Sequence, residues 1–275
     1  MSGALQLQPG ISVGNYRVIR LLGQGGMGAV YEVEHVQIGR RAAMKLLTLN
    51  VGQFPMVYQR FINEARAANQ IDHPGVVQVF EFGQLPSGIP WMMMEYVPGD
   101  PLDRRIKQAR ESPDRLLPVQ ETLTILHQLS TILEAAHAAG IVHRDMKPQN
   151  VMLIPDPAVP FGERVRLLDF GIAKLLGDTL QAEGGEEALQ TASGATLGTP
   201  AYMAPEQCKN SGKIDGKADV YAVGVMAYQM LCGRLPFWDR ESVSLMATKL
   251  YEDPPPIRQF APSLSPSIEA LVMSM

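Results

Sequence analysis

The feature that most constrains the fold of this chain is a change of hydrophobic periodicity at Pro98-Gly99. Before this break, helical spacing occurs at residues 61–71. The other apolar residues fall in short runs typical of antiparallel β-strands, at residues 16–36, 41–48, 76–82 and 90–97. After the break, residues 116–139 and 218–231 have helical spacing, and Gly140 stands where the first of these helices would end.

Two lobes are therefore predicted, in an α+β fold. Residues 16–97 should form an antiparallel sheet with one main helix, and residues 98–275 should be mostly helical. Residues 1–15 show no clear period and are expected to be a flexible lead-in. With 275 residues, of which 46% are hydrophobic, the chain is long enough to bury a substantial core.

Charge and cysteine content exclude several classes of partner. The formal net charge of −4 is spread along the chain without a basic stripe, so nucleic acid is not an expected partner. The two cysteines, Cys208 and Cys232, have neither CxxC nor CxxH spacing, which argues against disulfides or structural zinc and fits a reducing compartment. No window of about 18 residues is apolar enough to cross a membrane. We expect a cytoplasmic location without membrane contact in this stretch, while an anchor beyond residue 275 stays open.

A glycine cluster lies between the first two strand-like runs. Its sequence is Gly23-Gln24-Gly25-Gly26-Met27-Gly28-Ala29-Val30. Glycines lack a Cβ atom, so backbone amides in such a turn can approach a phosphate closely. An ordinary hairpin turn is the alternative, and the strand context argues against a dinucleotide-binding fold, in which the glycines open a helix.

Lys45 follows in an apolar run, Ala42-Ala43-Met44-Lys45, where a charge needs a partner to offset its desolvation. It is expected to hold the α- and β-phosphates of a nucleotide and to pair with a carboxylate on the next helix. Glu64 is the best-placed candidate, although a solvated glutamate on a helix face is the alternative.

The segment His143-Arg144-Asp145-Met146-Lys147-Pro148-Gln149-Asn150 places a carboxylate, a cation and a carboxamide on one short loop after a helix. Phosphoryl transfer needs these groups more for alignment than for covalent chemistry. Asp145 would orient the attacking hydroxyl, Lys147 would neutralise charge on the γ-phosphate, and Asn150 would ligate Mg²⁺. His143 is expected to pack against its neighbours and not to take part in the chemistry.

A strand-like run, residues 165–168, leads into Asp169-Phe170-Gly171. An aspartate at a strand end can bind a Mg²⁺ ion that bridges the phosphates. The tripeptide alone occurs by chance, but here Ala204-Pro205-Glu206 follows in the same order as in a known set of motifs.

Together these motifs resemble the signature set of the eukaryotic-type protein kinase family. The segment from Gly198 to Gln207 and the run Met146-Lys147-Pro148-Gln149-Asn150 are similar to its bacterial Ser/Thr branch. The resemblance extends from Tyr16 nearly to the end. It implies a bilobal kinase fold, with ATP and Mg²⁺ as cofactors and the γ-phosphoryl group passing to Ser or Thr hydroxyls of protein substrates.

The resemblance also implies finer assignments. Adenine would lie between Val30 and Ala43 on one side and Met152 on the other. Met94 would limit the depth of this pocket. Asp219 would brace the catalytic loop from the start of a helix, and backbone groups of Glu95 and Val97 would bond the purine edge.

Regulation is predicted from the residue before the catalytic aspartate. Arg144 is placed to receive a phosphate from the activation segment, with Thr191, Ser193 and Thr196 as the candidate sites. Autophosphorylation in trans would require self-association of two copies. Thr199 is excluded as a phosphosite, because the resemblance places it in the substrate site.

The chain departs from the family pattern in three places. An extra proline-rich loop occupies residues 155–162, and the activation segment, residues 169–206, is long and acidic. The arginine that normally pairs with the Ala-Pro-Glu glutamate has no clear match after Glu206. We therefore expect residues 98–275 to be a lobe that stops before its last helix, and a buried Glu206 to lack its arginine.

Three rival interpretations remain. A pseudokinase would keep the fold but lose a catalytic residue, whereas Lys45, Asp145, Asn150 and Asp169 are all present. A small-molecule kinase of the aminoglycoside type should lack the segment from Gly198 to Glu206. A tyrosine kinase would usually replace Lys147-Pro148 by an Ala/Arg arrangement.

Overall fold

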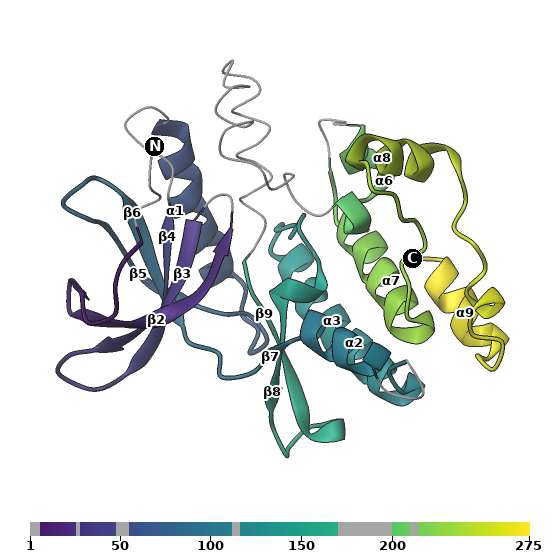
Figure 1. Ribbon diagram of the computed structural model, residues 1–275, viewed down its shortest axis with the longest axis horizontal. Coiled ribbons are helices and arrows are strands. Elements are labelled where there is room, and N and C mark those ends of the chain that lie inside the picture. The colour runs from purple at the N-terminus through teal and green to yellow at the C-terminus, as the bar shows by residue number, and fades with distance from the viewer. Residues whose placement is uncertain (1–5, 26–27, 48–54, 112–115, 170–199, 210–213) are drawn as a thin grey trace. The chain divides into compact units, whose positions relative to one another are not determined.

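The computed structural model describes residues 6–25, 28–47, 55–111, 116–169, 200–209 and 214–275 (Figure 1). These residues form two compact units. The first contains the described residues up to Gln70 together with Val77–Pro98. The second contains Ile71–Val76 and the described residues from Gly99 onward. The predicted α+β class is confirmed, since the first unit is built on a sheet and the second is mostly helical.

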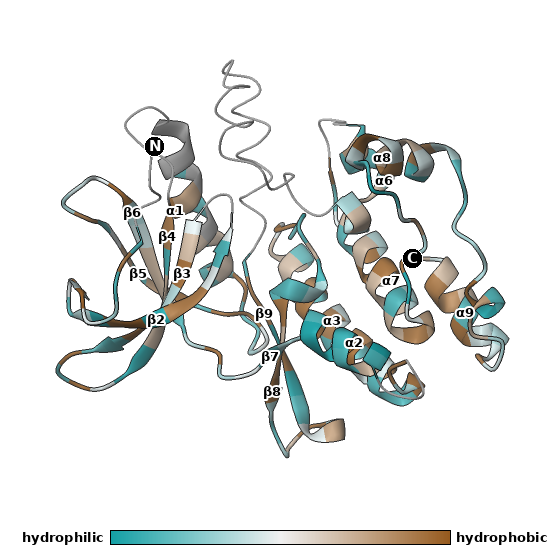
Figure 2. Ribbon diagram, viewed as in Figure 1, coloured by the Kyte–Doolittle hydropathy of each residue, from teal (hydrophilic) through white to brown (hydrophobic). Residues whose placement is uncertain are grey.

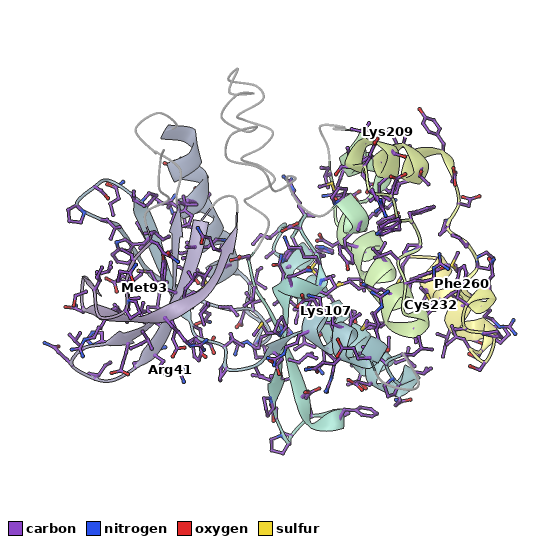
Figure 3. The ribbon with its side chains drawn as sticks, in the orientation of Figure 1. Arg41, Met93, Lys107, Lys209, Cys232 and Phe260 are labelled. Atoms are coloured by element: carbon purple, nitrogen blue, oxygen red, sulfur yellow. The ribbon has the colours of Figure 1, made fainter. Side chains whose placement is uncertain are left out.

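The first unit contains a six-stranded antiparallel sheet in the order β1-β2-β3-β4-β6-β5. Its elements are β1 (Ser12–Val13), β2 (Tyr16–Gly25), β3 (Gly28–His35), β4 (Arg41–Leu47), α1 (Pro55–Gln70), β5 (Val79–Gln84) and β6 (Pro90–Glu95). Tyr31 faces Met44 across β3 and β4, and Met44 faces Met93 across β4 and β6. All three side chains are fully buried, and Met93 is labelled in Figure 3. Their cross-strand row forms the core of this unit on one face of the sheet.

Part of the expected flexible lead-in is ordered. Val13 pairs with Tyr16 in β1 and β2 and is 5% exposed, and the Leu7 N–H donates to the Tyr31 hydroxyl at 3.1 Å. Leu7 also packs against the core cluster. The expectation of a flexible segment is therefore wrong for residues 7–13, because the apolar side chains of Leu7 and Val13 pack in the core of the sheet. A two-residue strand is too short to show a period in the sequence.

The second unit combines a small sheet, in the order β7-β8-β9, with several helices. Its principal elements are β7 (Asp100–Pro101), α2 (Leu102–Glu111), α3 (Val119–Ala138), β8 (Val151–Pro155), β9 (Glu163–Leu167), α6 (Pro205–Cys208), α7 (Lys217–Cys232), α8 (Ser242–Tyr251) and α9 (Pro266–Met273). Short 3₁₀ turns, named η1 to η4, occupy Pro148–Asn150, Pro160–Gly162, Pro200–Tyr202 and Ile257–Gln259. None of the helices in the described ranges has the length and apolar composition to cross a bilayer.

Helix α7 is the central helix of the second unit. It has buried residues on all sides, whereas α2 buries only Leu102 and Ile106, and Figure 2 shows the same contrast between an apolar α7 and a polar α2. A helix that is apolar all round belongs in a core. Gly140 (φ 74°) and Gly233 (φ 73°) follow α3 and α7 in the left-handed conformation that ends many helices, as expected for Gly140.

The extra proline-rich loop is the turn between β8 and β9. It includes the 3₁₀ turn η2, in which Phe161 is 54% exposed and has a φ of 62°. Val159 and Pro160 form one side of a surface pocket of about 470 Å³, and the rest of its lining comes from α3, β9 and residues 73–75. The loop is therefore a local addition that leaves the β8–β9 pairing intact.

Candidate active site

The hairpin of β8 and β9 brings the two candidate metal ligands together. Asn150 directly precedes β8, and Asp169 follows two residues after the end of β9. Val151 pairs with Leu167 at this end of the hairpin, and the Leu168 N–H donates to the Asn150 carbonyl at 2.8 Å. Because the strands are antiparallel, the residue before one and the residues after the other lie at the same end.

The catalytic loop places Asp145, Lys147 and Asn150 in direct contact. Lys147 Nζ lies 2.6 Å from Asp145 Oδ2, and Asn150 Nδ2 donates to the Asp145 carbonyl at 2.8 Å. Since the nitrogen of this carboxamide is used inside the loop, its oxygen is left for a metal. The side chains of Lys147 and Asp145 are 21% and 16% exposed, so the pair is partly desolvated and still reachable.

The donor set fits Mg²⁺. An amide oxygen from Asn150 and a carboxylate from Asp169 are hard oxygen ligands, which Mg²⁺ prefers. Mg²⁺ is usually held by one or two protein groups together with substrate phosphates, so two ligands at one hairpin end are sufficient. When bound, the ion would neutralise charge on the phosphate oxygens.

Two residues of the site have a left-handed backbone. Arg144 has a φ of 64° and Asp169 a φ of 44°. Such angles are uncommon for residues other than glycine and cost roughly 1–3 kcal/mol each. Strained backbones of this kind cluster at functional sites, where the surrounding structure holds them.

The surrounding structure is supplied chiefly by Asp219 of α7, which is fully buried. Its Oδ2 accepts the His143 N–H at 2.8 Å, and its Oδ1 accepts the Arg144 N–H at 2.8 Å. The same Oδ2 lies 2.8 Å from His137 Nε2 of α3. This geometry agrees with the bracing role expected for Asp219. A capping role, the alternative for a carboxylate at a helix start, has no side-chain hydrogen bond to support it.

Two histidines support this arrangement. His143 is fully buried, and its Nδ1 accepts the Asp145 N–H at 3.3 Å. Nε2 therefore carries the proton and donates to the Leu168 carbonyl at 3.0 Å, which ties the loop to the residue before Asp169. The expected packing role of His143 thus includes two hydrogen bonds. The hydrogen bond to Asp219 raises the pKa of His137 above its usual value.

Gln207 was not predicted to have a role. Its Nε2 donates to the Arg144 carbonyl at 2.9 Å, and its Oε1 accepts the Ala204 N–H at 3.0 Å. These bonds join residues 204–207 to the catalytic loop. Arg144, Asp145 and Lys147 also share a small void with Tyr202 and Met203. The Ala-Pro-Glu region therefore lies beside the catalytic residues.

The predicted nucleotide-binding residues of the first unit share one sheet. Val30 pairs with Lys45 across β3 and β4, and Ala43 pairs with Met94 across β4 and β6. Ala43 and Lys45 are two residues apart, so all four lie on the face opposite the Tyr31–Met44–Met93 core. The structure therefore places these four residues together on one face of the sheet.

Glycine has two different roles in the glycine loop, at Gly28 and at Gly23 and Gly25. A Cβ atom at Gly28 would collide with the Leu46 carbonyl, so this position needs glycine for the sheet itself. Among the described residues, no atom lies within 4 Å of where a Cβ atom would stand at Gly23 or Gly25. Gly23, Gln24 and Gly25 pair with Val30, Ala29 and Gly28. The space over the first two glycines is open to a phosphate.

Other predicted contacts are only partly described. The Glu95 N–H donates to the Gln78 carbonyl at 3.0 Å, so this donor is already used within the first unit. Val97 follows β6 in the first unit, and Met152 lies in β8 of the second. Glu64 lies within α1, but its side chain is not among those described. The remaining predicted positions outside the described residues are Gly26, Met27, Thr191, Ser193, Thr196 and Thr199.

Glu206 differs from the expectation. It is half-buried rather than buried, and it is not without a partner. Arg234, which does not match the position of the missing arginine, places its guanidinium 4.1 Å from the ring centroid of Phe260, which is labelled in Figure 3. The cation that lies beside this region, and that the sequence did not reveal, is Lys249, which is 4% exposed.

Comparison with known proteins agrees with these features. The chain is 41% identical over 265 residues to the serine/threonine-protein kinase Pkn1 of Myxococcus xanthus, an alignment that covers 96% of this chain and 35% of that protein. It is 36% identical to the serine/threonine-protein kinase pkn3 of the same organism, over 94% of this chain and 45% of that protein. The chain thus spans less than half the length of these two relatives.

Solved structures also match. The crystal structure of the Mycobacterium tuberculosis PknI kinase domain superimposes with a TM-score of 0.69 at 28% identity, covering 98% of this chain and 89% of that one. The protein kinase domain family matches residues 16–275. This chain therefore belongs to the protein kinase domain family, in its bacterial Ser/Thr branch.

Proposed function

We propose that this domain transfers the γ-phosphoryl group of ATP to Ser and Thr hydroxyls of proteins. The observation that carries the proposal is the contact set of Asp145, Lys147 and Asn150 on a loop held by Asp219. It combines a proton acceptor, a cation and a metal-ligand oxygen within one short loop. Phosphoryl transfer uses this combination.

In the proposed reaction, Asp145 accepts a hydrogen bond from the acceptor hydroxyl and directs its oxygen at the γ-phosphorus. A new oxygen–phosphorus bond forms, the bond from the γ-phosphorus to the bridging oxygen breaks, and ADP leaves. The hydroxyl proton passes to the Asp145 carboxylate. Lys147, which contacts the same carboxylate at 2.6 Å, is close enough to neutralise charge on the transferred group.

Nucleotide binding is proposed for the sheet face of the first unit that carries Val30, Ala43, Lys45 and Met94. The openness of the space over Gly23 and Gly25 supports phosphate binding there. Asn150 and Asp169 are proposed to hold Mg²⁺. The domain is proposed to act in the cytoplasm, where ATP is available.

The proposal is tested by acceptor analysis. The purified domain is incubated with radiolabelled ATP, Mg²⁺ and casein, and the product is hydrolysed in acid. We expect labelled phosphoserine and phosphothreonine, because Lys147 and Thr199 resemble the pair that lines the short-hydroxyl site of Ser/Thr kinases. A predominance of phosphotyrosine would contradict the proposed Ser/Thr acceptor class. If the unmodified domain transferred phosphate no faster than the Asp145→Asn variant, the proposed kinase activity would be contradicted.

Activation by autophosphorylation in trans is proposed as the regulation of the same site. Arg144 is the anchor: its N–H is held by Asp219 and its carbonyl by Gln207, so its position is fixed next to Asp145. A phosphate of about −1.5 to −2 charges on Thr191, Ser193 or, less favourably, Thr196 would pair with its guanidinium.

Mass spectrometry tests this regulation. Phosphate is expected on at least one of Thr191, Ser193 and Thr196 in the active protein, and on none in the Asp145→Asn variant. Mixing that variant with active protein should restore its phosphorylation if transfer occurs between two copies. Full activity of the triple alanine variant would rule the mechanism out.

A further inference from the structure

Lys249 of α8 is a buried cation. Its side chain is 4% exposed and lies one helical turn after the buried Leu245. An ammonium group in such a place is costly unless its donors are used. Nζ donates to the Ala201 carbonyl at 2.6 Å and to the Met203 carbonyl at 2.8 Å. It also lies 5.2 Å from the ring centroid of Tyr221, within cation–π range.

The two carbonyls belong to a segment beside the catalytic residues. Residues 200–203 include η3, and Tyr202 and Met203 share a void with Asp145 and Lys147. The Tyr202 hydroxyl donates to Gln229 Oε1 of α7 at 2.7 Å, which fixes this side chain. Lys249 fixes the backbone on both sides of Tyr202. The path of this segment past Asp145 therefore depends on a contact from α8.

We infer that Lys249 is a positioning residue for the protein acceptor. The acceptor hydroxyl of a protein substrate must reach Asp145. The substrate segment that carries this hydroxyl must then pass Tyr202 and Met203, which lie beside Asp145. By holding the carbonyls of Ala201 and Met203, Lys249 sets the shape of the surface against which that chain lies. The inference rests on the proposed function, because it concerns the acceptor of the same reaction.

The electrostatics favour this role over simple stabilisation. A buried apolar residue at position 249 would avoid the desolvation cost of the ammonium group, but it would leave the carbonyls of Ala201 and Met203 without this donor and their segment without this constraint. A buried lysine instead supplies three N–H donors from one point. Two of them bond carbonyls that are two residues apart, which defines a local backbone conformation.

The test compares Lys249→Met, which keeps the length and removes the charge, with Lys209→Met. Lys209 is exposed at the end of α6 in the same region, as labelled in Figure 3, so its variant controls for the loss of one positive charge near the acceptor. For Lys249→Met we expect the KM for a peptide acceptor to rise by about tenfold or more, the ratio for losing one charge-assisted hydrogen bond. The KM for ATP and the rate of ATP hydrolysis without acceptor should change by less than about twofold, since the two carbonyls that Lys249 bonds belong to Ala201 and Met203 and not to the proposed catalytic residues.

The outcomes separate the inference from the proposed function. If the unmodified domain transfers phosphate and Lys249→Met leaves the acceptor KM unchanged, the inference fails and the proposed function stands. An equal rise in the KM for ATP would show a general structural role and would also overturn it. If the Met variant does not fold, Lys249→Gln replaces it in the test, because glutamine keeps a neutral N–H donor. An unchanged KM for the peptide acceptor in Lys249→Gln would then overturn the inference. Lys249→Arg, with a cation and several donors, should recover most of the affinity.

Discussion

Asp145→Asn should lower kcat for protein phosphorylation by about 10²- to 10⁴-fold, the usual contribution of a positioned proton acceptor. Asparagine keeps the shape of the side chain and an oxygen that Lys147 Nζ can contact, but it cannot take the hydroxyl proton. The fold should survive, because the main-chain contacts of the loop to Asp219 and Asn150 do not use the Asp145 side chain. Affinity for ATP should stay within about twofold, since Asp145 is proposed to act on the acceptor hydroxyl and not on the nucleotide.

The matched control is Asp103→Asn. Asp103 pairs with Lys107 on α2 through Oδ2 at 3.1 Å, so this change also removes a carboxylate from an Asp–Lys pair. Lys107 is labelled in Figure 3 and is 71% exposed, and such surface pairs contribute little. We expect unchanged kcat for Asp103→Asn. Near-normal turnover of Asp145→Asn would overturn the assignment of the catalytic loop.

Asp169→Asn separates metal binding from proton acceptance. Loss of a carboxylate ligand should weaken nucleotide binding in the presence of Mg²⁺ and leave binding in its absence unchanged. Titration of a fluorescent ATP analogue with and without Mg²⁺ measures this difference. An equal loss in both conditions would indicate that Asp169 serves the structure of the loop and not the metal.

The sequence was sufficient for the catalytic loop because its parts are contiguous. Asp145, Lys147 and Asn150 lie within six residues, so one motif was enough to predict that they lie together, and the loop's local hydrogen bonds hold them there. The bounds of β4 and α3 were predictable to within a few residues, since these two runs are long enough to show a period.

The sequence was insufficient where contacts join distant segments through single side chains. Lys249 bonds carbonyls 46 and 48 residues away, and no local pattern encodes such a pair. The one available signal was its position four residues after Leu245, on the apolar face of α8, where a charge is unusual. Gln207 likewise reaches Arg144 across 63 residues. The Glu206 prediction failed because it assumed burial, which a motif does not specify.

Asp219 should be the most sensitive position outside the catalytic loop. Its carboxylate accepts two loop N–H groups and contacts His137, with every distance at 2.8 Å. Asparagine has one acceptor oxygen and an NH₂ group, so Asp219→Asn must leave at least one of the N–H groups of His143 and Arg144 facing a donor. An unsatisfied buried donor costs about 1–3 kcal/mol. For a domain of this size each kcal/mol lowers Tm by roughly 2–4 °C.

The variant should also lose kcat, because the left-handed backbone at Arg144 (φ 64°) is held by this carboxylate, and Asp145 follows directly. Asp215→Asn is the matched control. Asp215 is an exposed aspartate just before α7, and the one described hydrogen bond of its carboxylate is to the Lys217 N–H, at 2.9 Å. It should change neither Tm nor kcat beyond small effects. Equal Tm and kcat for Asp219→Asn and the unmodified domain would contradict the bracing role.

Measuring the stability of the domain as a function of pH isolates the contribution of the contact between Asp219 and His137. The pKa of His137 is raised mainly by its hydrogen bond to Asp219, so the protonated ring is favoured in the folded state. Its contribution to stability is therefore fully present below the unfolded pKa of about 6.5 and is lost as the pH rises through the higher folded value. Thermal melts of the unmodified domain should show this loss as the pH rises above about 6.5, and Asp219→Asn should not, because an amide does not favour the charged ring. If the variant kept the same pH dependence, another carboxylate, of which Asp215 is the nearest candidate, would be the source of the raised pKa.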